Sequence, residues 1–186
     1  MTSRPEPIDS VRLALPAEAA AIAALQRRSW SAAPGPQVTA VLDEVSLEEM
    51  TTAWHRAVTR PPLARCRVLV ALSAAGGAPV GFAATVPSDD ADAGPADGAV
   101  DEFAVEPAAR HRGHGSRLLH ACVDTLRADG FTRARWWLNA DDDEVRGFLL
   151  AAGWAADGAW REIGSPDGRL RLKQVRMHTD IADQGP

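Results

Sequence analysis

The segment from Gly98 to Gly130 constrains the fold more than any other part of the chain, because three local signals follow one another in it. An apolar run of strand length, Ala99–Val105, is closed by a proline that cannot donate to a strand ladder. A basic turn with two glycines, Arg110 to Ser116, comes next, and apolar residues then recur at helical spacing. Because a helix N-terminus offers N–H groups without intrahelical partners, this strand–turn–helix order predicts a phosphate-binding site.

Two common phosphate motifs fit the turn poorly. A dinucleotide fingerprint needs a third glycine three residues after Gly115, where the chain has Leu118. A P-loop needs Gly-Lys-Ser/Thr, whereas the sequence reads Gly115-Ser116-Arg117. A nucleotide-phosphate enzyme of Rossmann type therefore stays only as an alternative interpretation.

Length and composition exclude several classes of protein. With 186 residues we expect one domain over 1–186, with a core at about 8–180 and loose termini. The formal net charge of −5 argues against a nucleic-acid partner, and no apolar run is long enough to predict a membrane span. Cys66 and Cys122 lack metal or redox spacing, and the N-terminus lacks a signal-peptide core, which favours a reduced cytoplasmic protein. The abundance of Ala, Arg, Asp and Gly is typical of a GC-rich bacterial genome.

Strands and helices are predicted on both sides of the central segment. Before it we expect a strand at 11–14, helices at 17–30 and 46–57, and strands at 67–72 and 80–86. Ser46 followed by Glu49 is a capping-box pattern for the second helix. The acidic stretch 88–97 is expected to be a flexible loop. After the segment we expect a strand at 134–139, a short helix behind the carboxylates at 141–144, and two further strands from 154 and 171.

The turn resembles motif A of the GNAT superfamily of acyl-CoA N-acyltransferases. Arg110, Gly113 and Gly115 meet the pattern Q/R-x-x-G-x-G/A, at the usual distance after a strand that ends Val105-x-Pro107. The resemblance covers about residues 8–180. It implies an α/β fold with a mixed central sheet of about six to seven strands, splayed between the fourth and fifth and flanked by about four helices.

The resemblance continues in the C-terminal part, with two departures. Family members often carry an Asn before the short helix, a Phe-Tyr pair inside it and Gly-Phe or Gly-Trp after it. The corresponding residues here are Asp142, Phe148-Leu149 and Gly153-Trp154. Many relatives use that tyrosine to protonate the departing thiolate, but this chain has Leu149 there and contains no tyrosine.

The resemblance implies acetyl-CoA as cosubstrate, held in the V between the splayed strands, and it implies no metal. The pantetheine amides would pair with the central strand as an added strand does, and the pyrophosphate would lie on the turn. The implied cofactor-binding residues are Phe103, Ala104, Val105, Arg110, His111, Arg112, Gly113, His114, Gly115, Ser116, Asp142 and Phe148. His111 and His114 are otherwise expected on the surface of the turn.

Two acidic residues that interrupt the central strand are candidate catalytic bases. An amine is mostly protonated at pH 7, so acyl transfer is helped by a base beside the acyl group. Alternation along a strand places Asp101 on one face and Glu102 on the other. We prefer Asp101, although either side chain can instead be a strand-edge charge that reaches solvent. Of the adjacent Trp136 and Trp137, one is expected in the core and the other is a candidate wall of the acceptor pocket.

The sequence therefore predicts an N-acetyltransferase that moves the acetyl group of acetyl-CoA to a primary amine by direct attack in a ternary complex. The expected acceptor is a small-molecule amine, a peptide N-terminus or a lysine, and a homodimer stays open. One hypothesis is that the acceptor is cationic and is guided by the carboxylates between Asp89 and Asp97. The alternative, favoured by the missing tyrosine, is a catalytically weak acyl-CoA-binding or regulatory protein on the same scaffold.

Overall fold

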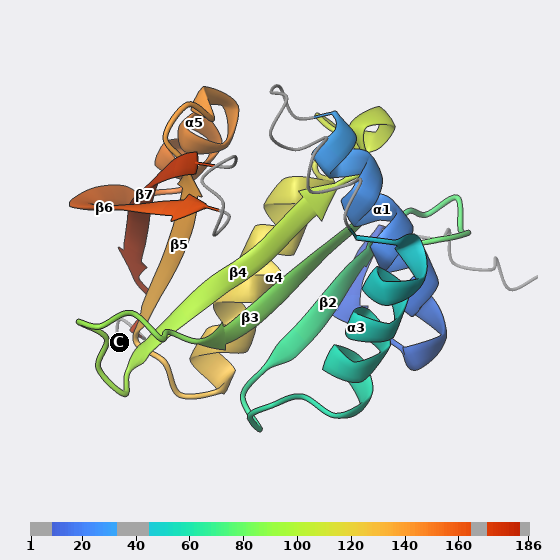
Figure 1. Cartoon of the computed structure of the whole chain (residues 1–186), viewed down its shortest axis with the longest axis horizontal. Helices are drawn as coiled ribbons and strands as arrows, with labels where there is room; N and C mark the ends of the chain where they lie inside the picture. The colour runs from blue at the N-terminus through green and yellow to red at the C-terminus, as the bar shows by residue number, and fades with distance from the viewer. Residues whose placement is uncertain (1–8, 33–44, 165–170, 183–186) are drawn as a thin grey trace, which may run out of the picture. The chain divides into compact units, whose positions relative to one another are not determined.

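The computed structural model describes residues 9–32, 45–164 and 171–182 (Figure 1). The expected loose ends, 1–8 and 183–186, lie outside these ranges. The described helices and strands are β1 (Ser10–Leu13), α1 (Ala19–Ser31), α3 (Leu47–Thr59), β2 (Arg67–Leu72), β3 (Gly81–Pro87), β4 (Asp97–Val105), α4 (His114–Ala128), β5 (Arg133–Asn139), α5 (Asp143–Ala151), β6 (Ala155–Gly164) and β7 (Arg171–Asp180). Short 3-10 helices, Pro16–Glu18 and Pro107–Ala109, precede α1 and follow β4. Over the described ranges, the predicted order of helices and strands is confirmed.

The strands form one mixed sheet in the order β1-β2-β3-β4-β5-β7-β6. β4 and β5 are parallel, and α4 is the crossover between them, whereas β7 is antiparallel to both β5 and β6. The parallel register runs from Asp97 opposite Arg133 to Val100 opposite Trp136, and β4 then continues to Val105. The mixed α/β fold predicted from the sequence is thus confirmed, with the pairing of the fourth and fifth strands ending part way along β4.

Internal contacts divide the chain into two compact units, which are described separately. The first comprises Met1–Ala84 with Glu102–Cys122, and the second comprises Thr85–Asp101 with Val123–Pro186. β3, β4 and α4 contribute residues to both units. The expectation of a single domain stays a prediction.

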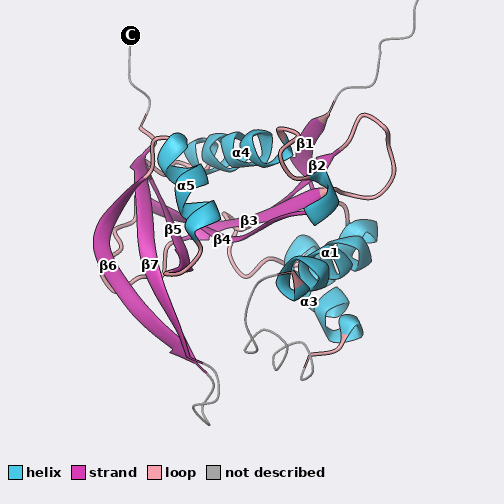
Figure 2. Cartoon of the chain, turned by 90° about the horizontal axis from the view of Figure 1, so that it is seen from above, coloured by secondary structure: helices cyan, strands magenta, loops and turns pink. Residues whose placement is uncertain are grey.

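The core of the first unit lies between the strands β2 and β3 and the helices α1 and α3, which also pack on each other (Figures 1 and 2). Its buried side chains include Ile22, Leu25, Met50, Val70 and Phe82. Trp54 packs edge-on against Phe82, with ring centroids 5.0 Å apart, and its indole N–H donates to Gln26 Oε1 at 2.8 Å. The buried indole and amide therefore satisfy each other, which is the condition for polar groups in a core.

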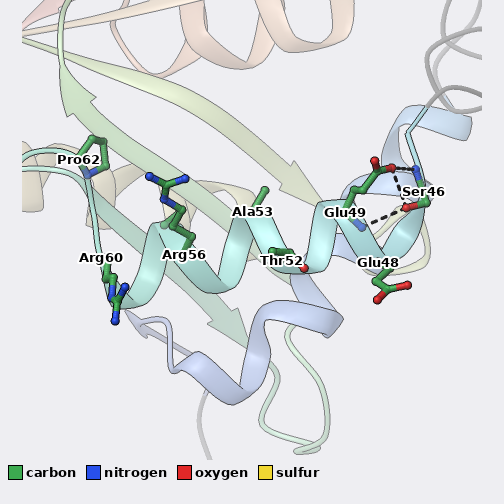
Figure 3. Close-up of a pocket in the computed structure, with 9 residues that line it drawn as sticks. Ser46, Glu48, Glu49, Thr52, Ala53, Arg56, Arg60 and Pro62 are labelled. Atoms are coloured by element: carbon green, nitrogen blue, oxygen red, sulfur yellow. Dashed lines mark hydrogen bonds between the residues drawn. The ribbon is translucent and has the colours of Figure 1, made fainter.

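The start of α3 shows that the local sequence signals were reliable. Ser46 Oγ accepts a hydrogen bond from the Glu49 N–H at 3.1 Å, and Glu49 Oε2 accepts one from the Ser46 N–H at 2.8 Å (Figure 3). This reciprocal pair is the predicted capping box, and it fixes the helix N-terminus at Leu47.

The helix-covered face of the second unit's sheet is apolar. Gly98 of β4 lies beneath Leu126 of α4 and Phe131, and Trp136 packs edge-on against Trp154, with centroids 6.2 Å apart. Because side chains alternate along a strand, Trp137 points to the opposite face. Trp136 is accordingly the core member of the tryptophan pair, with 7% of its surface exposed. Within the described ranges, no helix is both long and apolar enough to cross a membrane.

We expect Gly98→Ala to destabilise the protein because the site has no room for a side chain. A Cβ there would lie 2.6 Å from Leu126 Cδ2 and 2.9 Å from Phe131 Cγ. Such overpacking costs about 1–3 kcal/mol of unfolding free energy, measurable by urea denaturation. The control is Gly147→Ala, on α5 with open space around it, which should instead stabilise by about 0.5–1 kcal/mol. A Gly98→Ala protein as stable as the wild type would contradict the packing of α4 on β4.

Candidate active site

The turn that precedes α4 has the backbone geometry of an anion site. His111 and Gly113 adopt left-handed conformations, with φ of 59° and 84°. The Arg117 N–H donates to the Gly113 carbonyl at 3.1 Å, which closes the first turn of the helix. The N–H groups of His114, Gly115 and Ser116 therefore come before the helix's own hydrogen bonds and are directed beyond its N-terminus.

An acidic residue that the sequence reasoning missed holds the start of α4. Asp9 accepts hydrogen bonds from the Ala74 N–H at 2.8 Å and from Arg117 Nη1 at 3.0 Å. Its Oδ2 lies 3.8 Å from Nδ1 of His114, which is buried, so the expectation that His114 lies on the surface is wrong. The Ala74 N–H, and then the nearby positive groups of the turn, lower the pKa of Asp9 against the opposing effect of partial burial. The ion pair of Asp9 with Arg117 thus links the start of β1 to the turn before α4. The two residues are 108 positions apart, so their contact is visible only in the folded chain.

The exit of β4 into the turn is fixed by contacts within the first unit. The Glu106 N–H donates to the Val80 carbonyl at 2.8 Å, and its carboxylate pairs with the Arg28 guanidinium at 2.7 Å. Ala104 and Val105 are buried, and Phe103 is half-buried. The candidate cofactor residues from 103 to 116 thus belong to one continuous strand–turn–helix segment, as the sequence predicted.

The two candidate cofactor residues near α5 lie in the second unit. Asp142 caps α5, since its side chain accepts a hydrogen bond from the Val145 N–H at 2.9 Å. Phe148 is half-buried. Leu149, which the resemblance aligns with the family tyrosine, is completely buried and contributes to the core. A role of Asp142 and Phe148 in cofactor binding stays a prediction.

Two nearly buried arginines organise the other face of the second unit's sheet. Arg135 on β5 and Arg176 on β7 expose only 3% and 7% of their surfaces. Arg135 pairs with Asp90, Asp92 and Asp97 at 3.2, 2.8 and 3.0 Å. Arg176 pairs with Asp90, Asp92 and Asp157 at 3.0, 2.7 and 2.7 Å. These two arginines and four aspartates are called the ion cluster below.

The ion cluster corrects the interpretation of the acidic stretch 88–97. The hydrogen bond from Arg176 holds the pKa of Asp92 far below its usual range. Burial acts to raise the pKa of Asp90, but hydrogen bonds from Trp137, Arg176 and Arg135 outweigh it and lower that pKa. Three carboxylates of the stretch are therefore compensated by the arginines, two of them largely buried and the third, Asp92, with its side chain 59% exposed. The stretch is tied to the sheet rather than loose, and most of the charge expected to guide a cationic acceptor is compensated.

Asp101 lies on this face outside the ion cluster, close enough to Asp89, which is also outside it, for their charges to interact. It follows Val100, the last β4 residue in register with β5, so alternation directs it to the face of Trp137. Its side chain reaches water, but surrounding protein atoms desolvate the carboxylate and raise its pKa. Asp89 raises the pKa further, whereas the positive charge of Arg161 lowers it. Glu102, the other candidate base, is half-buried and belongs to the first unit.

Arg161 on β6 is a further residue that the sequence reasoning missed. Its guanidinium carbon lies 4.4 Å from the ring centroid of Trp137, a cation–π distance. The indole N–H of Trp137 in turn donates to Asp90 Oδ1 at 2.8 Å. The side chains of Asp101, Trp137 and Arg161 therefore lie on the same face of the sheet, within the second unit.

A separate hollow runs along the exposed side of α3 (Figure 3). It is lined by Ser46, Glu48, Glu49, Thr52, Ala53, Arg56, Ala57, Arg60 and Pro62. In Figure 3 the guanidinium of Arg56 points away from that of Arg60, and Glu48 lies at the other end of the helix. Glu49 is engaged in the capping box. This is the pattern of a solvated helix face rather than of a site with convergent polar groups. Nowhere in the described part of the chain do three or more His, Cys, Asp or Glu side chains gather in a way that could hold a metal ion.

Known proteins match the chain at the level of family and of fold. The model of the acetyltransferase (GNAT) family matches residues 22–154. No curated protein sequence matches the chain significantly.

Three solved structures illustrate the likeness in fold. The structure of yncA from Salmonella typhimurium, described as an acetyltransferase with its cofactor acetyl-CoA, has a TM-score of 0.70 at 18% identity over 96% of each chain. A GCN5-related N-acetyltransferase from Kribbella flavida has a TM-score of 0.68 at 23% identity, over 95% of this chain and 99% of that one. A ribosomal-protein-alanine N-acetyltransferase from Brucella melitensis has a TM-score of 0.70 at 19% identity, over 92% and 99%. At these identities the likeness shows a shared fold.

Loss of one arginine should show how much stability the ion cluster contributes. We expect Arg176→Met to lower the unfolding free energy by about 3–5 kcal/mol, because carboxylates are left without their counter-charge in a largely buried place. Urea denaturation followed by tryptophan fluorescence measures the change. The matched control is Arg171→Met on the same strand, where the side chain is 75% exposed and the change should stay within about 0.5 kcal/mol. Equal stability of the two variants would refute the structural role of the cluster.

Proposed function

The chain belongs to the GNAT acetyltransferase family, and from this premise we propose that it transfers the acetyl group of acetyl-CoA to a primary amine by direct attack in a ternary complex. The observation that carries the proposal is the turn before α4, with its left-handed Gly113 and its N–H groups directed beyond the helix. A helix N-terminus of this kind suits the pyrophosphate of CoA. The acetyl-CoA in the Salmonella structure supports the choice of acyl donor.

The binding of CoA divides into a backbone part and a charged part. We assign the pyrophosphate to the N–H groups from Arg112 to Ser116, with Arg110 and Arg112 supplying positive charge beside them. The pantetheine arm would lie along β4 at Phe103 to Val105, beyond the point where the parallel register with β5 ends. Asp142 and Phe148 complete the proposed set.

The chemistry requires a neutral amine and an exit for one proton. The thioester supplies an electrophilic carbonyl, and the attacking nitrogen gains a bond to its carbon as the sulfur leaves with the electron pair. Asp101, directly or through a water molecule, takes the proton released by the nitrogen. A carboxylate whose pKa is raised is a better base than an ordinary aspartate, and desolvation and Asp89 raise that of Asp101. The thiolate then takes its proton from solvent, which is acceptable because thiols are already fairly acidic.

A second candidate function rests on one observation. The position of the family tyrosine is filled by a fully buried leucine, Leu149, and the chain contains no tyrosine. This favours a protein that binds acyl-CoA but turns it over weakly, in a regulatory role. Release of CoA thiol with any amine, at rates well above hydrolysis without amine, would exclude this alternative.

The CoA site is tested by placing a negative charge in the turn. We expect Gly115→Glu to weaken CoA binding at least about tenfold, because the pyrophosphate loses charge-assisted hydrogen bonds and meets a carboxylate. Isothermal titration calorimetry with CoA measures the affinity, and circular dichroism checks the fold. Ala128→Glu, which adds the same side chain at the far end of the same helix, should leave the affinity unchanged. If both variants bind CoA like the wild type, the turn is not the pyrophosphate site.

The assignment of the base is tested by comparing the two acidic residues of β4. We expect Asp101→Asn to lower kcat by about 10²–10⁴-fold with little change in the KM for acetyl-CoA, since a well-placed base contributes that much. Glu102→Gln should lower kcat far less.

The pH profile adds a second criterion. Asp101 acts in its deprotonated form, and its raised pKa moves the acid-side loss of activity above the ordinary aspartate range. Asp101→Asn should remove this acid limb and leave only the limb due to the amine. A large loss of kcat in Glu102→Gln instead would assign the base to that residue.

A further inference from the structure

The guanidinium of Arg161 is held in a fixed position on the polar face of the second unit. Its Nε donates to Gln174 Oε1 at 2.8 Å, and Gln174 Nε2 lies 3.4 Å from Asn139 Oδ1. Arg161 and Gln174 are direct neighbours across the β6–β7 pair, as Gln174 and Asn139 are across β5–β7. With the ring of Trp137 against its other side, the guanidinium has little freedom left.

Arg161 differs from the two arginines of the ion cluster in what it is bonded to. Arg135 and Arg176 each direct their guanidinium groups to three aspartates. Within the residues that the structure describes, Arg161 makes one hydrogen bond, to Gln174, and no carboxylate lies within ion-pair distance of it. The terminal nitrogens of this exposed arginine thus form a planar fork of donors, the geometry that matches a carboxylate in a bidentate pair.

The fork shares its face with the proposed base. Asp101 and Trp137 point to the same face of the sheet, and Arg161 lies over the Trp137 ring on that face. The positive charge of Arg161 also acts to lower the pKa of the Asp101 carboxylate. An acceptor with a negative group next to its amine would therefore meet a cation and a base on the same surface. A polycationic amine would instead meet the positive charge of Arg161. The carboxylates of the ion cluster are already paired with arginines, which leaves Asp89 and Asp101 outside the cluster.

We propose that the acceptor amine carries a carboxylate, as an α-amino acid does, and that Arg161 binds this carboxylate while the amine lies toward Asp101. This inference rests on the proposed acetyl transfer and names its substrate class. Arg161 is then a specificity-determining residue, because it binds a part of the acceptor that does not react. Gln174 and Trp137 are positioning residues that orient its fork.

The test compares acceptors that differ only in the carboxylate. Acetyl-CoA consumption is measured with the twenty L-amino acids, with their carboxamides and with spermidine, on the wild type and on Arg161→Gln. The wild type should prefer the best amino acid over its carboxamide at least about tenfold in kcat/KM, because a charge-assisted bidentate pair is lost in the amide. Amide amines are less basic and more often neutral, so intrinsic reactivity works against this expected preference.

Arg161→Gln should remove the preference. We expect kcat/KM for the amino acid to fall at least about tenfold, and that for the carboxamide to change by less than about threefold. Arg161→Lys should recover part of the preference, since it restores the charge without the fork. Arg171→Gln is the matched control on the same hairpin, with the same loss of charge, and should keep the wild-type ratio.

The outcomes separate this inference from the proposed function. Equal or faster acetylation of carboxamides, acetylation of spermidine alone, or an unchanged ratio in Arg161→Gln would overturn the inference and leave acetyl transfer standing. A protein that binds CoA yet acetylates no amine in the three series, and no peptide N-terminus or peptide lysine either, would overturn the proposed function itself.

Discussion

The pairing of Arg135 and Arg176 with four aspartates is the interaction on which the polar side of the second unit depends. Guanidinium groups as buried as these would be strongly destabilising without counter-charges, so the acidic stretch 88–97 has to lie on the sheet. Asp90, shared by both arginines, also accepts the indole N–H of Trp137. One charge network therefore joins the loop to β4, β5, β6 and β7, and it also holds the aromatic side chain of Trp137.

The same network determines which charges remain available to a ligand. Asp90, Asp92, Asp97 and Asp157 are compensated within the protein. Asp101 is left outside the cluster with a raised pKa, and Arg161 is held by neutral partners. Net composition suggested an acidic surface that attracts cations, but most of the aspartates in the stretch 88–97 are paired with arginines. The acceptor with groups of both signs that we propose rests on this arrangement. The net charge that this face presents to a ligand depends on which carboxylates are paired with arginines, and not on the number of carboxylates alone.

The parts that the sequence predicted well are those with local causes. The capping box of Ser46 and Glu49 and the glycine-bearing turn before α4 are each specified within a few residues, so the pattern was sufficient. The ion pair of Asp90 with Arg176 joins residues 86 positions apart and depends on the register of β5 with β7. The link from Asp9 to Arg117 spans 108 positions. Hydrophobic periodicity does not predict which residues pair over such separations. In the sequence, an arginine that will be buried on a strand cannot be distinguished from one that will be exposed.

This difference follows from how the two proposed sites recognise their ligands. The CoA site uses backbone N–H groups whose geometry is set by glycine conformations and by a helix start, and such features leave a readable trace in the sequence. The acceptor site uses side chains brought together from three strands, β4, β5 and β6, and it tolerates any residues that satisfy one another there. Leu149, where the resemblance implies a tyrosine, is compatible with the proposed reaction, because a thiolate can take its proton from solvent without a fixed side chain. The acceptor class that we propose therefore rests on the arrangement of Asp101, Trp137 and Arg161 on one face, which the fold shows and the sequence pattern does not.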